Sequence, residues 1–361
     1  IVANGYPMQE KIPDVNEPAS GYLWTNLAKN GKTYYHFGEF VATKFCSEAP
    51  ASKKPANPLQ GTPEPTPQVC ARNSVRKGEP IPANYGGGIS QYPWRIPLIA
   101  QDIATKPELV GHFDPQFQDF QLSVPDQFRV SEFLTHFNTW VSDREQGKDS
   151  MPAFVMLRLP DDHTAGTLPD MPRPEASIAD NDLAVGRAVD AVSHSPFWND
   201  TAFFILEDDA QDGADHVDAH RSLMLVVSKY APRESASGTP FVDHHFYTTV
   251  SAVRTLETLL GLPPMNNNDA FAPLMAPEFS GDGTQPAFKA DYVNRDNGRI
   301  YEENTAASYG AKQSAKMNFG QADMADTAKL NMILWRDEMG SQPVPQQLLT
   351  AHPHHPDPDG D

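Results

Sequence analysis

The residues with the clearest chemical potential lie at positions 207–220, directly after an apolar run at 202–206. They read Glu-Asp-Asp-Ala-Gln-Asp-Gly-Ala-Asp-His-Val-Asp-Ala-His, so carboxylates and imidazoles are crowded into one short segment. Crowded carboxylates repel one another, and bound divalent cations remove that repulsion. His216 and His220 are four residues apart, so a helical turn places both on one face, within reach of one ion. We expect a metal-binding loop here; the alternative is an acidic surface turn.

A second cluster follows the apolar run at 154–159 and contains Asp161, Asp162 and His163. In α/β sheets, ligands gather at the carboxyl ends of the strands, so we expect both clusters at one edge of a sheet. A mixture of carboxylates and imidazoles suits zinc or manganese, whereas calcium and magnesium favour oxygen ligands alone. The expected metal ligands are Asp162, His163, Asp208, Asp209, His216 and His220.

Other histidines and acids stand apart from these clusters. His112 and Asp114, in the sequence Gly-His-Phe-Asp-Pro, and the pair His244 and His245 are more typical of turns and helix caps than of ligands. The chain has no Gly-rich phosphate loop, no Gly-x-Ser-x-Gly sequence and no Cys-x-x-Cys pair. Nucleotide-binding, serine-hydrolase and thiol-redox functions therefore lose support.

The scaffold that must position these clusters alternates strand and helix patterns. Apolar runs predict strands at 154–159, 202–206 and 223–227, and helical spacing predicts helices at 130–141, 178–192 and 247–260. The sequence Gly-Leu-Pro-Pro that begins at Gly261 is a strong stop signal for the last of these helices. This order predicts an α/β fold with a mostly parallel central sheet flanked by helices on both faces.

The chain divides by composition into three parts. Residues 1–125 are rich in proline and glycine, and we expect them to form an irregular cap or insertion. Residues 126–345 carry the periodic segments and the two ligand clusters, and we expect them to form the α/β core. Residues 346–361 are a low-complexity His/Pro/Asp tail, which we expect to be disordered.

Charge and cysteine content narrow the class of protein. Among 361 residues, 47 are acidic and 28 basic, and the net charge of -19 argues against general nucleic-acid binding. No apolar stretch approaches the roughly 20 residues that a membrane-spanning helix needs. Cys46 and Cys70 could close one loop as a disulfide, with two buried free thiols as the alternative. An even cysteine count suits a periplasmic, secreted or cell-surface protein.

Several segments in order along the chain resemble the phosphoesterase family of bacterial phospholipases C and acid phosphatases, within the alkaline phosphatase superfamily. The resemblance is greatest to the branch that is often attached to β-propeller repeats. It implies an alkaline-phosphatase-like fold in which metals activate a serine or threonine hydroxyl that attacks phosphorus. The matching segments include Gly21-Tyr-Leu-Trp24, Gly111-His-Phe-Asp-Pro115, Leu159-Pro-Asp-Asp-His-Thr-Ala-Gly166, Ala179-Asp-Asn-Asp-Leu183, Ser193-His-Ser-Pro-Phe-Trp198, Glu207-Asp-Asp-Ala-Gln211 and Asp215-His-Val-Asp-Ala-His-Arg221.

The resemblance also implies roles for individual residues. Asp208 and Asp209 lie where the superfamily places a metal-binding pair, and His163 and His220 would be ligands from flanking loops. Arg158 and Arg221 could neutralise the phosphate or serve as structural partners of the surplus carboxylates.

One part of the family pattern is missing from this sequence. In the family, a Glu-Asn-Arg metal motif and the nucleophile precede the segment that corresponds to Gly21, and the twenty residues before Gly21 contain neither. The nucleophile is therefore expected upstream, and one expected source is an N-terminal companion polypeptide of the same precursor.

The expected function is that of a metal-dependent phosphoric ester hydrolase, a phosphatase or a phospholipase C-like phosphodiesterase. Zinc is the favoured metal, and manganese or calcium are the alternatives. Two other functions remain open: a non-catalytic structural or assembly protein that retains the fold, and a sulfatase or phosphonate hydrolase on the same fold.

Overall fold

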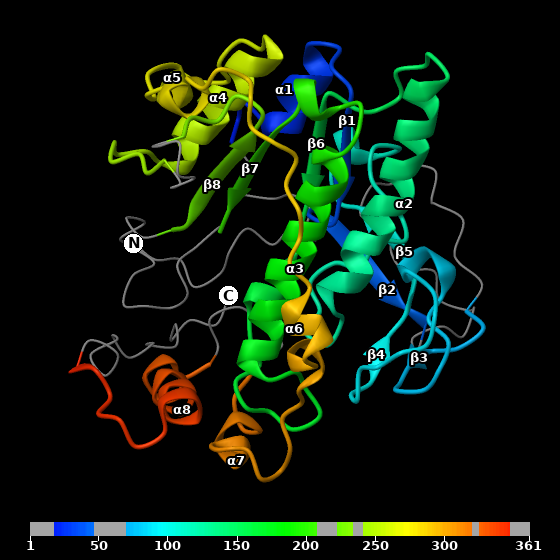
Figure 1. The fold of residues 1–361 in the computed structure, drawn as a ribbon, viewed down its shortest axis with the longest axis vertical. Coiled ribbons are helices and arrows are strands. Elements are labelled where there is room, and N and C mark those ends of the chain that lie inside the picture. The colour runs from blue at the N-terminus through cyan, green and yellow to red at the C-terminus, as the bar shows by residue number, and fades with distance from the viewer. Residues whose placement is uncertain (1–17, 47–69, 208–221, 234–240, 320–324, 347–361) are drawn as a thin grey trace.

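The computed structural model describes residues 18–46, 70–207, 222–233, 241–319 and 325–346, which form a mixed α/β structure (Figure 1). The strands are β1 (Tyr34–Phe37), β2 (Val41–Phe45), β3 (Ser74–Val75), β4 (Ile96–Pro97), β5 (Ile99–Ala104), β6 (Phe154–Leu157), β7 (Ala202–Leu206) and β8 (Met224–Ser228). The α-helices are α1 (Leu23–Lys29), α2 (Asp126–Glu145), α3 (Pro174–Ser193), α4 (Thr249–Leu260), α5 (Asn267–Ala270), α6 (Val293–Asp296), α7 (Ala311–Ser314) and α8 (Thr327–Met339).

The centre of the fold is the parallel pair β1 and β6, in which Tyr34 lies opposite Phe154 and Phe37 opposite Leu157. Successive side chains of a strand point to opposite faces. Phe154 accordingly packs with α1 and α4, whereas Leu157 packs with α2 and α3. This pair therefore has helices on both faces, as the sequence predicts, and β1 comes from the region expected to be an irregular cap.

The two long helices begin where their sequences favour it. Pro125 precedes α2 and Pro174 opens α3, positions where a missing N–H costs nothing. Asp126 and Glu175 then place negative charge in the first turns, where the helix dipole favours it. Phe133 and Phe137 of α2 and Ala184 of α3 are buried in one apolar cluster with Phe37. The helices expected at 130–141 and 178–192 are thus confirmed and extend beyond those bounds.

The third expected helix is also confirmed. In α4 the Thr248 N–H donates to the Ser251 hydroxyl at 3.2 Å, which closes the first turn. The helix ends at Gly261, whose φ of 67° is left-handed, so the expected stop signal operates through glycine's freedom to adopt that conformation.

The strand pairing differs from the expected single, mostly parallel sheet. In the described ranges the strands form two-stranded sheets, and β2 with β5, β3 with β4 and β7 with β8 are antiparallel. Ala202 lies opposite Ser228 and Leu206 opposite Met224, so β8 runs back along β7. The mixed α/β class is confirmed, but these residues do not assemble one large parallel sheet.

A disulfide joins Cys46 to Cys70, with their Cα atoms 5.7 Å apart. The disulfide alternative is therefore correct and the free-thiol alternative is wrong. In the described segments, no helix is both long and apolar enough to cross a membrane. The tail at 346–361 lies outside the described residues, apart from its first residue.

Candidate functional site

The predicted ligand cluster at 161–163 lies directly after β6. Pro160–Asp162 form a short 3-10 turn, and His163 donates its backbone N–H to the Pro160 carbonyl at 3.1 Å. Asp162 and His163 keep 35% and 41% of their side chains exposed, and His163 Nδ1 lies 2.9 Å from Asp162 Oδ1. An imidazole held through Nδ1 by a carboxylate can bind a metal through Nε2. The two residues are therefore adjacent and accessible at the carboxyl end of a core strand.

Asp161 does not share this position, although the sequence places it beside Asp162. It is only 3% exposed, and its backbone N–H donates to Asp126 Oδ2 at 3.0 Å. Asp161 Oδ2 in turn accepts the Asp126 N–H at 3.1 Å. The expectation that Asp161 emerges with its neighbours is wrong, because the start of α2 and the Arg129 guanidinium, 3.5 Å from Asp161 Oδ1, draw this carboxylate inward.

Arg158 is held between two carboxylates. Its Nε lies 3.1 Å from Glu39 Oε1, and its Nη1 lies 3.0 Å from Asp119 Oδ1. Its guanidinium also lies over the Phe120 ring, 5.3 Å from the centroid. These contacts match the structural alternative for Arg158, while a role in binding phosphate stays a prediction.

The predicted ligand cluster at 207–220 begins where β7 ends. Asp208, Asp209, His216, His220 and Arg221 lie outside the described residues. The described range 70–207 ends at Glu207, whose N–H donates to the Leu223 carbonyl at 3.1 Å.

The core connects the strands that precede the two clusters. Phe203 of β7 packs on the same apolar cluster as Val155 and Leu157 of β6. The two strands that lead into the predicted ligand clusters are therefore anchored in one core.

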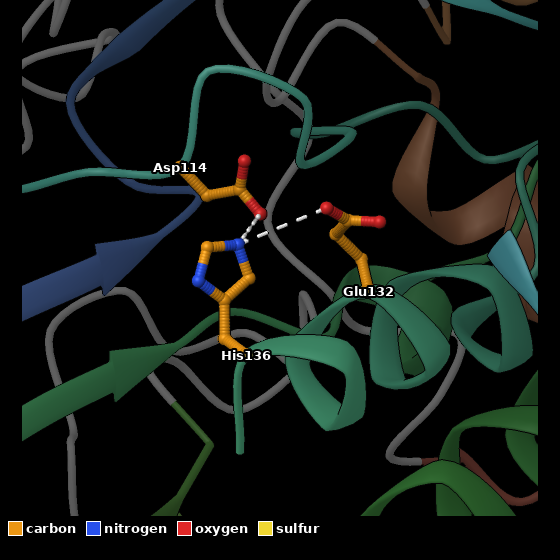
Figure 2. A group of neighbouring side chains, drawn as sticks. All are labelled: Asp114, Glu132 and His136. Atoms are coloured by element: carbon orange, nitrogen blue, oxygen red, sulfur yellow. Dashed lines mark ion pairs between the residues drawn. The ribbon is translucent and has the colours of Figure 1, made fainter. Parts of the chain in front are cut away.

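Three further side chains form a group that sequence reasoning missed, and Figure 2 shows them converging. Glu132 and His136 are four residues apart on α2, and Asp114 comes from the segment that follows a bridge between His36 and Phe113. His136 Nε2 lies 3.3 Å from Asp114 Oδ2 and 3.9 Å from Glu132 Oε1. One ligand atom from each residue lies within 4.8 Å of the other two, so the group could hold a metal ion.

The electrostatics of this group are unfavourable without a cation. Burial, and then the nearby Asp114 charge, raise the pKa of Glu132 to about 8. Two full negative charges within 4.8 Å of each other repel by about 3 kcal/mol or more at an effective dielectric constant of 20. Burial raises the pKa of the adjoining Asp102 well above its usual value, and the Asp114 charge adds to that shift. The metal-free group therefore holds protons that a cation would displace.

The sequence contains a signal that could have identified this group. Glu-x-x-x-His within a predicted helix places both side chains on one face, which is the reasoning used for His216 and His220. Glu132 and His136 lie within the helix expected at 130–141. The third residue of the group, Asp114, lies in a separate segment and resembles an ordinary turn residue, so the sequence does not link it to the other two.

Comparisons with protein-family models, curated proteins and solved structures found no match for this chain. The fold and the site together define a mixed α/β protein with one disulfide and a possible metal-binding group.

Proposed function

We propose that this chain is the metal-binding part of a phosphoric ester hydrolase of the alkaline-phosphatase-like type. One observation carries the proposal: the two predicted ligand clusters directly follow β6 and β7, and both strands are anchored in one apolar cluster through Leu157 and Phe203. Loops that leave two strands anchored in one core can supply ligands to a common ion.

The donor set fits a transition-metal site as far as the structure describes it. Asp162 supplies a carboxylate and His163 an imidazole that this carboxylate orients at 2.9 Å. Zinc is the favoured cation, with manganese or calcium as alternatives, and it would polarise phosphoryl oxygens and lower the pKa of a hydroxyl nucleophile. The other proposed ligands are Asp208, Asp209, His216 and His220, and Arg221 is proposed to neutralise the phosphate.

The same proposal includes a larger sheet and a companion polypeptide. All four residues of β6 are only half-buried, although such apolar strands are fully covered inside parallel sheets. Additional strands from an N-terminal polypeptide of the same precursor would cover β6 and bring the serine or threonine nucleophile. The Cys46–Cys70 disulfide supports a periplasmic or secreted location, where such bonds persist.

The test begins with intact-mass analysis of the purified protein, which reports whether a companion polypeptide is present. Hydrolysis of a phosphomonoester and a phosphodiester is then measured before and after metal removal. We expect chelation to abolish hydrolysis and zinc to restore it, and His163→Ala to lower kcat/KM by about 100-fold or more. His194→Ala is the matched control, because His194 is an exposed histidine that also lies 2.9 Å from an aspartate, Asp190.

Three results would replace this proposal with another function. Hydrolysis that survives both chelation and His163→Ala excludes the metal mechanism. Metal binding without hydrolysis, even with the companion polypeptide present, indicates a non-catalytic structural protein. Faster hydrolysis of sulfate esters or phosphonates than of phosphate esters indicates the third alternative, which needs the same metal ligands but another pocket.

A further inference from the structure

We infer that Asp114, Glu132 and His136 bind one divalent transition-metal cation, in a site separate from the proposed phosphoesterase centre. The site joins α2 to the segment that follows the bridge at Phe113. None of its ligands belongs to the clusters after β6 and β7, so the inference stands or falls independently of the proposed function.

Burial distinguishes this group from an acidic patch in water. Asp114 is 2% exposed and Glu132 is 4% exposed. Asp114 Oδ2 and Glu132 Oε2 accept no hydrogen bond from any part of the chain that the structure describes. The His136 Nε2 approaches Asp114 Oδ2 to 3.3 Å, but without hydrogen-bond alignment. Buried carboxylate oxygens are normally hydrogen-bonded. Asp114 Oδ2 instead points at His136 Nε2 with its acceptor capacity unused, and the Glu132 oxygen nearest to His136 Nε2 is Oε1, at 3.9 Å.

The group also lacks a permanent positive charge. Among the described residues, the ion pairs of Asp114 and Glu132 are with His136 alone, and no lysine or arginine takes part. Buried charges in proteins are paired or coordinate metals. A divalent cation would neutralise both carboxylates at once, which a singly charged imidazolium cannot do.

The distances suit a small transition metal. Ligand atoms about 2.0 Å from a tetrahedral ion are about 3.3 Å apart. The separations of 3.3 Å and 3.9 Å between His136 Nε2 and the two carboxylates therefore need only a small contraction. His136 keeps 32% of its side chain exposed, which leaves a path for the ion and room for a water as fourth ligand.

Neighbouring groups hold the ligands in place. The Gln116 N–H donates to Asp114 Oδ1 at 2.8 Å, which fixes this carboxylate with Oδ2 toward the group. The His136 ring lies 5.4 Å from the Tyr35 ring and 5.3 Å from the Phe37 ring, both on β1. Such support is typical of metal sites, in which surrounding contacts orient each ligand.

The imidazole decides between classes of cation. Calcium takes six to eight oxygen ligands, and this group offers two carboxylates and one nitrogen. One imidazole with two carboxylates suits zinc, which we expect to bind more tightly than calcium or magnesium.

The test measures zinc binding by the complete protein after metal removal, in a background in which the tail histidines His352, His354 and His355 are alanine. We expect Glu132→Gln and His136→Ala each to remove one equivalent of zinc, with affinity at that site lowered about 100-fold or more. His194→Ala is the matched control, since His194 is also four residues from an acid, Asp190, but has no second carboxylate partner among its described ion pairs. It should leave the stoichiometry unchanged.

A second measurement does not depend on variants that fold. Anomalous scattering at the zinc edge, from crystals of the unmodified protein, should place an ion between the three side chains. A zinc stoichiometry that Glu132→Gln leaves intact, or crystals that hold zinc elsewhere but not here, would overturn the inference. Failure of phosphoester hydrolysis would leave it standing, because that failure concerns His163 and its partners.

Discussion

Helix α2 contributes to two buried acidic groups that solve the same electrostatic problem differently. In the first, which we call the Arg129 network, Arg129 pairs with Asp126 and Asp161, and the Asp126 charge acts on the nearby Asp180. In the second, which we call the His136 group, Asp114 and Glu132 face His136. The first contains its own permanent cation, and the second does not.

The Arg129 guanidinium is completely enclosed and uses nearly all of its donors. Its Nη1 donates to Asp126 Oδ1 at 2.8 Å. Nη1 also lies 3.5 Å from Asp161 Oδ1, and the remaining hydrogen bonds go to carbonyls of the segment that leads into α2. The same side chain therefore neutralises carboxylates and shapes the loop before the helix. The carbonyl acceptors are those of Gln118, Asp119, Gln121 and Val124.

Arg129 and Glu132 are less than one helical turn apart on α2. The His136 group nevertheless has carboxylate oxygens without hydrogen bonds and contains no guanidinium. The difference indicates that an arginine neutralises buried carboxylates where a positive charge is needed only for folding. An imidazole with two carboxylates is suited to an ion that arrives from solution. Four substitutions can break or sharpen this comparison.

The largest effect is expected from Arg129→Leu. It leaves Asp126 and Asp161 buried without their cation and several carbonyls without donors, and we expect a loss of about 3–5 kcal/mol in the free energy of unfolding. Urea denaturation measures it. Arg144→Leu is the control in the last turn of α2, where the pair with Asp200 is exposed and should contribute about 1 kcal/mol or less. Equal losses in the two variants would contradict a central role for Arg129.

The next effect concerns the proton that the Arg129 network holds. Burial, and then the Asp126 charge, raise the pKa of Asp180 to about 7. The folded state therefore keeps a proton that the unfolded state releases near pH 4. The free energy of unfolding should fall as pH rises from about 4 to about 7, by on the order of 3 kcal/mol from this residue.

Asp180→Asn cannot titrate, so it should remove about 1.4 kcal/mol per pH unit from that slope. Urea denaturation at several pH values measures the slope. Tyr92→Phe is the companion variant: it removes the 3.1 Å hydrogen bond to Asp180 Oδ1, but the carboxyl still titrates and the slope should persist. An unchanged slope in Asp180→Asn would place the proton on another group.

The sequence predicts local elements well, because local patterns suffice for them. Helix spacing indicates α2 and α3, and Gly261 ends α4 as expected. The two cysteines form one disulfide, and this pairing could be predicted because the chain has no other cysteine. Strand pairing was less predictable, because β1 and β6 are far apart in the chain and only tertiary packing brings them together.

The candidate sites show the same limit more sharply. Asp161 and Asp162 are consecutive, yet one is buried against Arg129 and the other is only half-buried beside His163. No pattern in that tripeptide distinguishes them. Asp114 becomes a candidate ligand only because α2 packs beside its segment, a contact between distant positions that spacing alone cannot report.

The third and fourth substitutions are equivalent changes in the two groups, and the third is in the Arg129 network. Asp126 Oδ1 accepts from Arg129, while Oδ2 accepts from the Asp161 N–H and the Asn181 amide, each at 3.0 Å. Asp126→Asn has a single oxygen, so one side must face an amino group instead. Because a buried donor is then left unsatisfied, we expect a loss of about 1–3 kcal/mol in the free energy of unfolding.

The matching change in the His136 group, Glu132→Gln, should have a smaller effect and the opposite tendency. In chelator at a pH above about 8, where Glu132 is ionised, the loss of its charge beside Asp114 removes repulsion, so stability should be unchanged or rise by less than about 1 kcal/mol. Added zinc should then stabilise the unmodified protein but not this variant, because only an ion bound to the folded state raises its stability. If Asp126→Asn and Glu132→Gln are equally destabilising without metal, the Glu132 carboxyl already has hydrogen-bond partners in the folded protein. The His136 group would then resemble the Arg129 network in needing no ion from solution.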